Sequence, residues 1–155
     1  MSLEYLDNGN PEGSIARGLH RNVISGWTTG RTLLASESGS LVIFSTAAGQ
    51  AITLPTPVAG MQFDFAVHVT GTGTYSIATG SAAIFIGGGV DSSSTTVAEG
   101  GDTFVADPAA TIEMLLDGDT TGRLVGGWFT LTAISATVWN IRGTMMGVGT
   151  LATPF

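Results

Sequence analysis

The residues best suited to bind a metal ion lie in the stretch LLDGDTTG. Asp117, Asp119 and Thr121 have the spacing with which a calcium-binding loop of the EF-hand type begins, and a glycine follows them. Such a loop holds a bidentate glutamate at its twelfth position, which is Trp128 in this chain. We therefore expect no metal here and interpret the stretch as a hairpin connection between two strands.

Two further patterns could indicate catalysis or phosphate binding. His68 follows Asp64 by four residues, which on an extended strand puts both side chains on one face about 13 Å apart, too far for a catalytic dyad. The serines lack a Gly-x-Ser-x-Gly nucleophile motif. The run GGGVDSSSTT lacks the Gly-Lys-Ser/Thr ending of a phosphate loop, and we interpret it as a flexible loop tip. The sequence thus predicts no catalytic residue, cofactor or metal, and no enzyme.

Three tryptophans could stack on a ligand or a partner. Trp128 and Trp139 lie within apolar runs typical of strands, which favours packing in the core. Trp27 stands in a turn-rich segment with Arg21 and Arg31 nearby, and tryptophan and arginine are enriched at the energetic centres of protein interfaces. Packing of Trp27 over the end of its own sheet is the alternative, and the sequence leaves both open.

The composition indicates which elements carry these residues. Only 11% of the residues are charged, 43% are hydrophobic, and 23 of the 155 are glycine. This hydrophobic content excludes a disordered chain, and the glycines favour a turn-rich β protein of one domain. A surface so poor in charge suits burial against other subunits, so the composition favours a protein that assembles.

The charges exclude further classes of partner. A net charge of -7 is opposite to the basic stripe with which proteins bind nucleic acid. All five basic residues are arginines, and three of them fall within the first thirty-one positions, beside His20. The chain has no cysteine, no signal-peptide pattern at its start and no apolar run long enough for a membrane helix. We expect synthesis in the cytoplasm, no nucleic acid and no membrane partner.

Short strand-like runs separated by turn clusters follow the first thirty residues. The clearest is MQFDFAVHV, in which apolar residues alternate with polar or small ones from Met61 to Val69, so that one face is buried. We predict an all-β fold, an antiparallel β-sandwich or a jelly-roll-like barrel with an extended N-terminal arm. The predicted regions are the arm at 1–30, the β domain at 31–143 and an apolar C-terminal tail at 144–155.

Threonine and serine occupy many alternating strand positions where lysine and glutamate are usual. A hydroxyl-rich face docks on another protein without desolvating a charge, and the absence of lysine removes a common guard against edge pairing. We therefore expect neighbouring subunits to cover some edges and faces. The tail GTMMGVGTLATPF ends on Phe155 and either folds back onto its own core or inserts between subunits.

The stretch LLASESGSLVIFSTAAGQAITLPTPVAGMQFDFAV resembles the opening of small virion structural proteins of tailed bacteriophages. The pattern is Ser-Gly, an apolar strand, a small-residue turn, ITLP, then glycine and an aromatic-rich strand. A later tryptophan strand followed by TVWNIRG is also similar, so the likeness covers residues 31–143. The resemblance implies a capsid decoration or cement protein, which binds in many copies to the outside of an expanded head and stabilises it.

On this interpretation the partners are the major capsid protein and other copies of the chain in a homotrimer, and the protein lies on the outer surface of the virion. The arginine-containing arm is expected on the capsid, with the acidic β domain facing outward. The alternative is a tail-fibre or spike module that binds host surface carbohydrate, with Trp27 or Tyr75 as a stacking platform. The residues expected at the interface with the capsid or a neighbouring subunit are Arg17, His20, Arg21, Trp27, Arg31 and Phe155.

Overall fold

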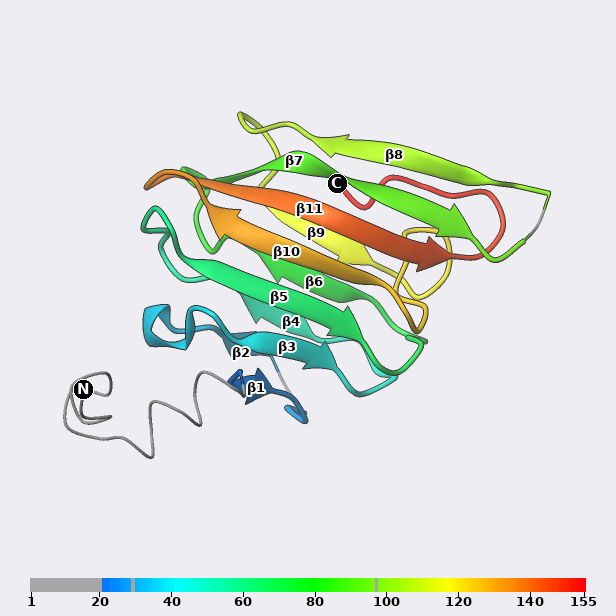
Figure 1. The fold of residues 1–155 in the computed structure, drawn as a ribbon, viewed down its shortest axis with the longest axis horizontal. Coiled ribbons are helices and arrows are strands. Elements are labelled where there is room, and N and C mark those ends of the chain that lie inside the picture. The colour runs from blue at the N-terminus through cyan, green and yellow to red at the C-terminus, as the bar shows by residue number, and fades with distance from the viewer. Residues whose placement is uncertain (1–20, 29, 97) are drawn as a thin grey trace, which may run out of the picture.

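The computed structural model describes residues 21–28, 30–96 and 98–155, which form two packed β-sheets (Figure 1). The predicted all-β, sandwich-like fold is confirmed, and neither sheet closes into a barrel. One short 3₁₀-helix, η1 (Ala35–Glu37), is the only helix among the described residues. The large sheet has the strand order β1 (Val23–Ile24), β3 (Leu41–Phe44), β5 (Gln62–Val67), β10 (Trp128–Ala133), β11 (Val138–Gly147), β7 (Phe85–Ser94) and β8 (Gly101–Ala106). The small sheet has the order β2 (Arg31–Thr32), β4 (Ala51–Thr53), β6 (Tyr75–Ala78) and β9 (Glu113–Leu116).

In the first half of the chain, successive strands belong alternately to the large and the small sheet. Strands β1, β3 and β5 belong to the large sheet, while β2, β4 and β6, which alternate with them along the chain, belong to the small sheet. A chain that crosses to the other sheet and returns runs again in its first direction, so neighbouring strands in each of these sets are parallel. The sheets are therefore mixed rather than antiparallel as predicted.

The second half of the chain completes both sheets. Strands β7 and β8 form an antiparallel hairpin, and β10 pairs antiparallel with both β5 and β11. Strand β11 then runs parallel to β7 over ten residue pairs, and β9 closes the small sheet against β6. Strands β1 and β8 consequently lie at opposite edges of the large sheet (Figure 1).

The glycine-rich run that we predicted as a loop tip lies in β7, between β11 and β8. Glycine has a low strand propensity, but pairing on both sides outweighs it here. At Gly88 the φ angle is +95°, and a Cβ atom would lie 2.3 Å from the carbonyl oxygen of Ile141. Only glycine allows the two backbones to approach this closely.

Alternate strand positions supply the core between the sheets. In β5, Phe63, Phe65 and Val67 are buried and the residues between them face outward, as the period of two predicts. Phe65 stacks on Phe129 of β10 with the ring centroids 4.7 Å apart. Trp139 of β11 is fully buried, which confirms its predicted place in the core. Each such side chain contributes roughly 1.5–3 kcal/mol through burial.

The C-terminal tail folds back onto its own domain, which confirms one of the two predicted alternatives. Strand β11 continues past the predicted boundary at residue 143 and ends at Gly147. Beyond it, the backbone N–H of Leu115 in the edge strand β9 donates to the carbonyl oxygen of Pro154 at 2.8 Å. Phe155 packs, partly buried, against the core. The tail thus covers part of one edge of the small sheet.

A buried arginine holds together the loops at one end of the sandwich. The guanidinium carbon of Arg123 lies 3.7 Å from the ring centroid of Tyr75, and in the described residues no carboxylate forms an ion pair with it. Burial lowers the pKa of Arg123 below its ordinary value, and Tyr75 opposes this change. A Cβ atom on Gly71 would lie 2.2 Å from Nη1, so the site requires glycine there. The hydrogen-bond acceptors of the guanidinium are the backbone carbonyl oxygens of Thr46, Ala47, Ala48 and Gly73.

Replacing Arg123 by alanine is expected to lower the free energy of unfolding by about 3–5 kcal/mol, because several buried carbonyl groups lose their donor. Arg142, an exposed arginine of β11, is the matched control, and Arg142→Ala should change that free energy by less than about 0.5 kcal/mol. Urea unfolding of both variants measures the difference. Equal stabilities would show that the loops do not depend on this guanidinium.

Candidate functional site

The candidate site is the outer face of the large sheet, the side turned away from the core. Strands β5, β10 and β11 build its centre, and the register places Trp128 between Ala66 and Thr144. Core-facing and outward positions alternate along each strand, so the outward residues form one continuous surface, in which Thr130 is 8% exposed. The residues of the outer face on these three strands are Gln62, Asp64, Ala66, Trp128, Thr130, Thr132, Val138, Asn140, Arg142, Thr144 and Met146.

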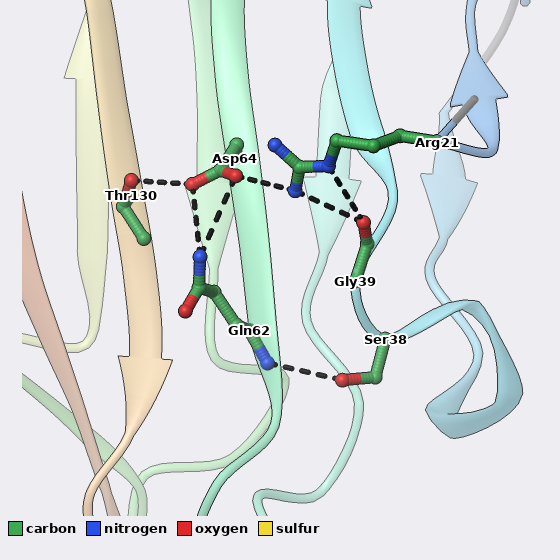
Figure 2. Close-up of polar contacts among 6 residues, drawn as sticks. All are labelled: Arg21, Ser38, Gly39, Gln62, Asp64 and Thr130. Carbon is green, nitrogen blue, oxygen red and sulfur yellow. Dashed lines mark hydrogen bonds and ion pairs between the residues drawn. The ribbon is translucent and has the colours of Figure 1, made fainter. Parts of the chain in front are cut away.

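An ion pair between Arg21 and Asp64 lies on this face (Figure 2). Nε and Nη2 of Arg21 also donate to the carbonyl oxygen of Gly39 at 3.1 and 2.9 Å. The carboxylate of Asp64 accepts a further hydrogen bond from the hydroxyl of Thr130 and one from the amide of Gln62 at 3.3 Å. Asp64 therefore connects β5 both to the neighbouring strand β10 and to Arg21, two residues before β1.

The surroundings of Asp64 favour its charged form. Partial burial raises the pKa of this carboxyl, but the hydrogen bonds from Thr130 and Arg21, the charge of Arg21 and the bond from Gln62 outweigh it. The pKa of Asp64 is consequently held below its ordinary value. His68 is exposed beyond the end of β5. Among the described residues, the partners of Asp64 are Arg21, Gln62 and Thr130, not His68.

Backbone and side-chain hydrogen bonds hold the segment after Arg21 on the large sheet. Leu41 N donates to the carbonyl oxygen of Asn22 at 2.8 Å, and Asn22 Nδ2 donates to Ser40 Oγ at 2.9 Å. Next to them, the backbone N–H of Gln62 donates to Ser38 Oγ at 3.0 Å (Figure 2). The described end of the predicted arm is thus part of the sheet.

The arginines predicted at an interface do not form one patch. Arg17 and His20 lie outside the described residues. Arg21 is paired with Asp64 on the large sheet, whereas Arg31 begins β2 of the small sheet and pairs with Glu37 of η1. Arg21 and Arg31 are therefore both neutralised within the chain. The sequence did not indicate either pairing.

Trp27 packs against its own core rather than standing free. Its ring lies edge-on to Phe44, with the centroids 6.4 Å apart and the planes at 69°. Its carbonyl oxygen accepts a hydrogen bond from Gln50 Nε2 at 2.6 Å. The structure thus shows this tryptophan packed on its own sheet, and its role at an interface stays a prediction.

Trp128 is the residue that the sequence interpretation misplaced. We predicted it in the core, but 51% of it is exposed, on the outer face. The next residue, Phe129, is fully buried, so the tryptophan at the start of β10 points the other way. The alternation from Trp128 to Thr132 already carried this signal, because threonine at every second position marks the outward side.

The Asp117 loop uses its carboxylate for its own backbone. The side chain accepts hydrogen bonds from the N–H groups of Asp119 and Thr121 at 2.8 and 3.0 Å and from the hydroxyl of Thr120 at 3.0 Å. These bonds outweigh partial burial and lower the pKa of Asp117. The described residues contain no group of three or more metal-ligating side chains. The loop joins strands of different sheets, so the predicted hairpin was wrong.

Comparison of the sequence with models of known protein families and with curated proteins gave no match. Among the residues that the structure describes, no helix has the length and apolar composition needed to span a membrane.

Asp64→Asn tests the ion pair through its pH dependence. Because the folded-state pKa is lowered, the stabilisation by Asp64 is present above its unfolded pKa, near 4, and is lost as the pH falls through the folded-state value. The variant should be less stable by about 1 kcal/mol at neutral pH, and the difference should vanish in strong acid. Urea unfolding at a series of pH values measures it.

The control for this experiment is Asp91→Asn, since Asp91 is exposed and its carboxylate accepts a hydrogen bond from Thr103 of the next strand. It should change the free energy of unfolding by less than about 0.5 kcal/mol. A stability difference for the Asp64 variant that stays constant from neutral to strongly acidic pH would contradict the role of its charge.

Proposed function

We propose that this chain is a structural protein of a tailed-bacteriophage virion that binds the outer surface of the capsid in many copies and stabilises it. The outer face of the large sheet is the proposed contact surface. The observation that carries this proposal is Trp128, a half-exposed indole on the outer face between Ala66 and Thr144. Buried tryptophans at the centre of an interface supply a large share of its binding energy.

The charges of this face also support docking on another protein. Arg21 and Asp64 neutralise each other, which leaves Arg142 as the unpaired charge on β5, β10 and β11 among the described residues. Hydroxyl and amide groups lose less on leaving water than charged groups do. A broad face of this kind is therefore suited to burial against a shell, in agreement with the resemblance of residues 31–143 to small virion proteins.

The first test is the copy number of the chain in gradient-purified particles of the virus that encodes it. Quantitative mass spectrometry should give a high, fixed ratio to the major shell protein. A low ratio that follows the tail proteins would move the chain to the tail. Absence from the particles would overturn a virion role altogether.

Trp128→Ala is expected to weaken binding of the purified protein to particles that lack it by about 30-fold, the effect of losing an interface anchor worth about 2 kcal/mol. Val58→Ala, which truncates an exposed apolar residue between β4 and β5, is the control and should bind as the unmodified chain does. Circular dichroism establishes that both variants are folded. Unchanged binding of the Trp128 variant would exclude the outer face as the contact.

A second candidate is a tail-fibre or spike module that binds host carbohydrate, because an exposed indole on a flat sheet can also stack on a sugar ring. Tyr75 cannot serve as the predicted platform, since it is 1% exposed and its hydroxyl bonds to Gln50. Trp27 packs on Phe44. Trp128 is thus the platform to test. A screen of host surface oligosaccharides, read by tryptophan fluorescence, should show a response that Trp128→Ala removes if this candidate holds.

A further inference from the structure

Strand β8 forms an edge of the large sheet that no other described segment pairs with. Ser94 N donates to the carbonyl oxygen of Gly100, and hydrogen-bonded pairs alternate along an antiparallel ladder. The N–H and C=O groups of Gly101, Thr103 and Val105 therefore point away from β7. These groups form a row of donors and acceptors for one more strand.

The side chains of β8 leave this edge with a single charged residue, Asp102. The strand has six residues and contains neither lysine nor proline, the residues that commonly block edge pairing. Val105 is 73% exposed, more than any other large hydrophobic residue that the structure describes. The tail covers part of the β9 edge of the small sheet, whereas β8 has no such cover among the described residues. The edge therefore combines free backbone groups with an exposed apolar side chain.

The charge around β8 is negative. Asp91 of β7 lies opposite Thr103 of β8. Asp102 is on β8 itself, and Glu99 and Asp107 flank the two ends of this strand. One described cation is nearby, Arg142 of β11. Gly89 of β7 lies between Arg142 and Val105 in the register of the three strands. An acidic edge of this kind favours an extended segment that carries a positive charge.

The sequence of this chain contains such a segment before β1. Residues 15–20, IARGLH, include Arg17 and His20, contain no acidic residue and match β8 in length. Ile15 and Leu19 stand two residues before and two residues after Arg17, so on an extended strand all three side chains would share one face. The segment precedes Arg21 and β1 in the sequence, and β1 lies at the edge of the large sheet opposite β8 (Figure 1).

We propose that β8 binds residues 15–20 of a second copy as an additional strand of the large sheet. With Arg17 beside Thr103, Ile15 and Leu19 lie beside the outward positions at either end of β8, one of which is Val105. The guanidinium of Arg17 then reaches the carboxylate of Asp91, about two strand spacings or 10 Å from its backbone. This assigns the arm to a neighbouring subunit rather than to the capsid.

The geometry distinguishes this occupant from the other choice, β8 of a second copy. Pairing two β8 strands would bring two acidic edges together, and like charges at an interface are unfavourable. A contact between opposite edges is instead heterologous, and it closes into a ring when the rotation between copies permits. Such a ring agrees with the predicted trimer. The contact does not involve the capsid, so the purified chain tests it independently of the proposed function.

Charge reversal tests the pairing of Arg17 with Asp91. Arg17→Asp and Asp91→Arg should each weaken self-association of the full chain in analytical ultracentrifugation by about tenfold, and the double variant should restore it. Asp119→Arg, which reverses an exposed carboxylate of the β9–β10 loop, is the matched control and should associate as the unmodified chain does. A monomeric unmodified chain, or a double variant as weak as the singles, would overturn the proposal.

Thr103→Pro tests the backbone pairing. The N–H that it removes points to the free edge, where proline is tolerated, so the variant should keep its fold by circular dichroism and lose association. Deletion of residues 1–20 should have the same effect. If the proline variant is monomeric while the deletion still associates, β8 pairs with β8 and the proposed occupant is wrong. Should the proline variant fail to fold, the charge-reversal set decides.

Discussion

The guanidinium of Arg123 is the contact on which the arrangement of the two sheets depends. A chain that passes from one sheet to the other at almost every strand leaves loop carbonyl oxygens at the end of the sandwich, where no strand pairs with them. The planar guanidinium carries five N–H donors and bonds to four of these carbonyls at once, more than the three donors of a lysine or the two of an amide allow. Loops after β3, β5 and β9 are thereby fixed to one another.

The same scarcity of charge shapes the surface. Of the four arginines that the structure describes, one is buried and two are paired with carboxylates. The outer face of β5, β10 and β11 then carries hydroxyl and amide groups together with the apolar side chains of Trp128, Val138 and Met146. Because strand alternation sends the phenylalanines of β5 and β10 inward, the outward positions are left for residues that need no partner inside the chain. The period of two along each strand therefore determines both the core and the outer face of the large sheet.

That periodicity explains which parts of the fold the sequence predicts. The alternation in β5, the burial of Trp139 and the all-β class follow from local pattern, and all three agree with the structure. The alternation of successive parallel strands between the two sheets does not follow from local pattern, because each connection uses different residues and the sequence shows no repeat. The glycine-rich part of β7 is stabilised by pairing with the strands on both sides, and the strand propensity of its own residues does not predict this.

The candidate site was harder to predict for a similar reason. Arg21 and Asp64 are distant in the sequence, and only the folded sheet brings them together. Trp128 was assigned to the core by residue type, although the threonines that follow it mark an outward row. Hydrophobicity indicates how much a side chain gains from burial, whereas its place in the strand decides whether it is buried.

The long parallel ladder between β7 and β11 has a consequence for how the protein is made. Its ten residue pairs join two segments that are far apart in the sequence, so the ladder cannot begin to form until β11 has left the ribosome. Until then the β7–β8 hairpin and strand β5 each have an open side in the nascent chain. The large sheet is therefore incomplete until β11 is free of the ribosome, and during that interval neighbouring nascent chains can pair wrongly. Chaperones have most to protect at that stage.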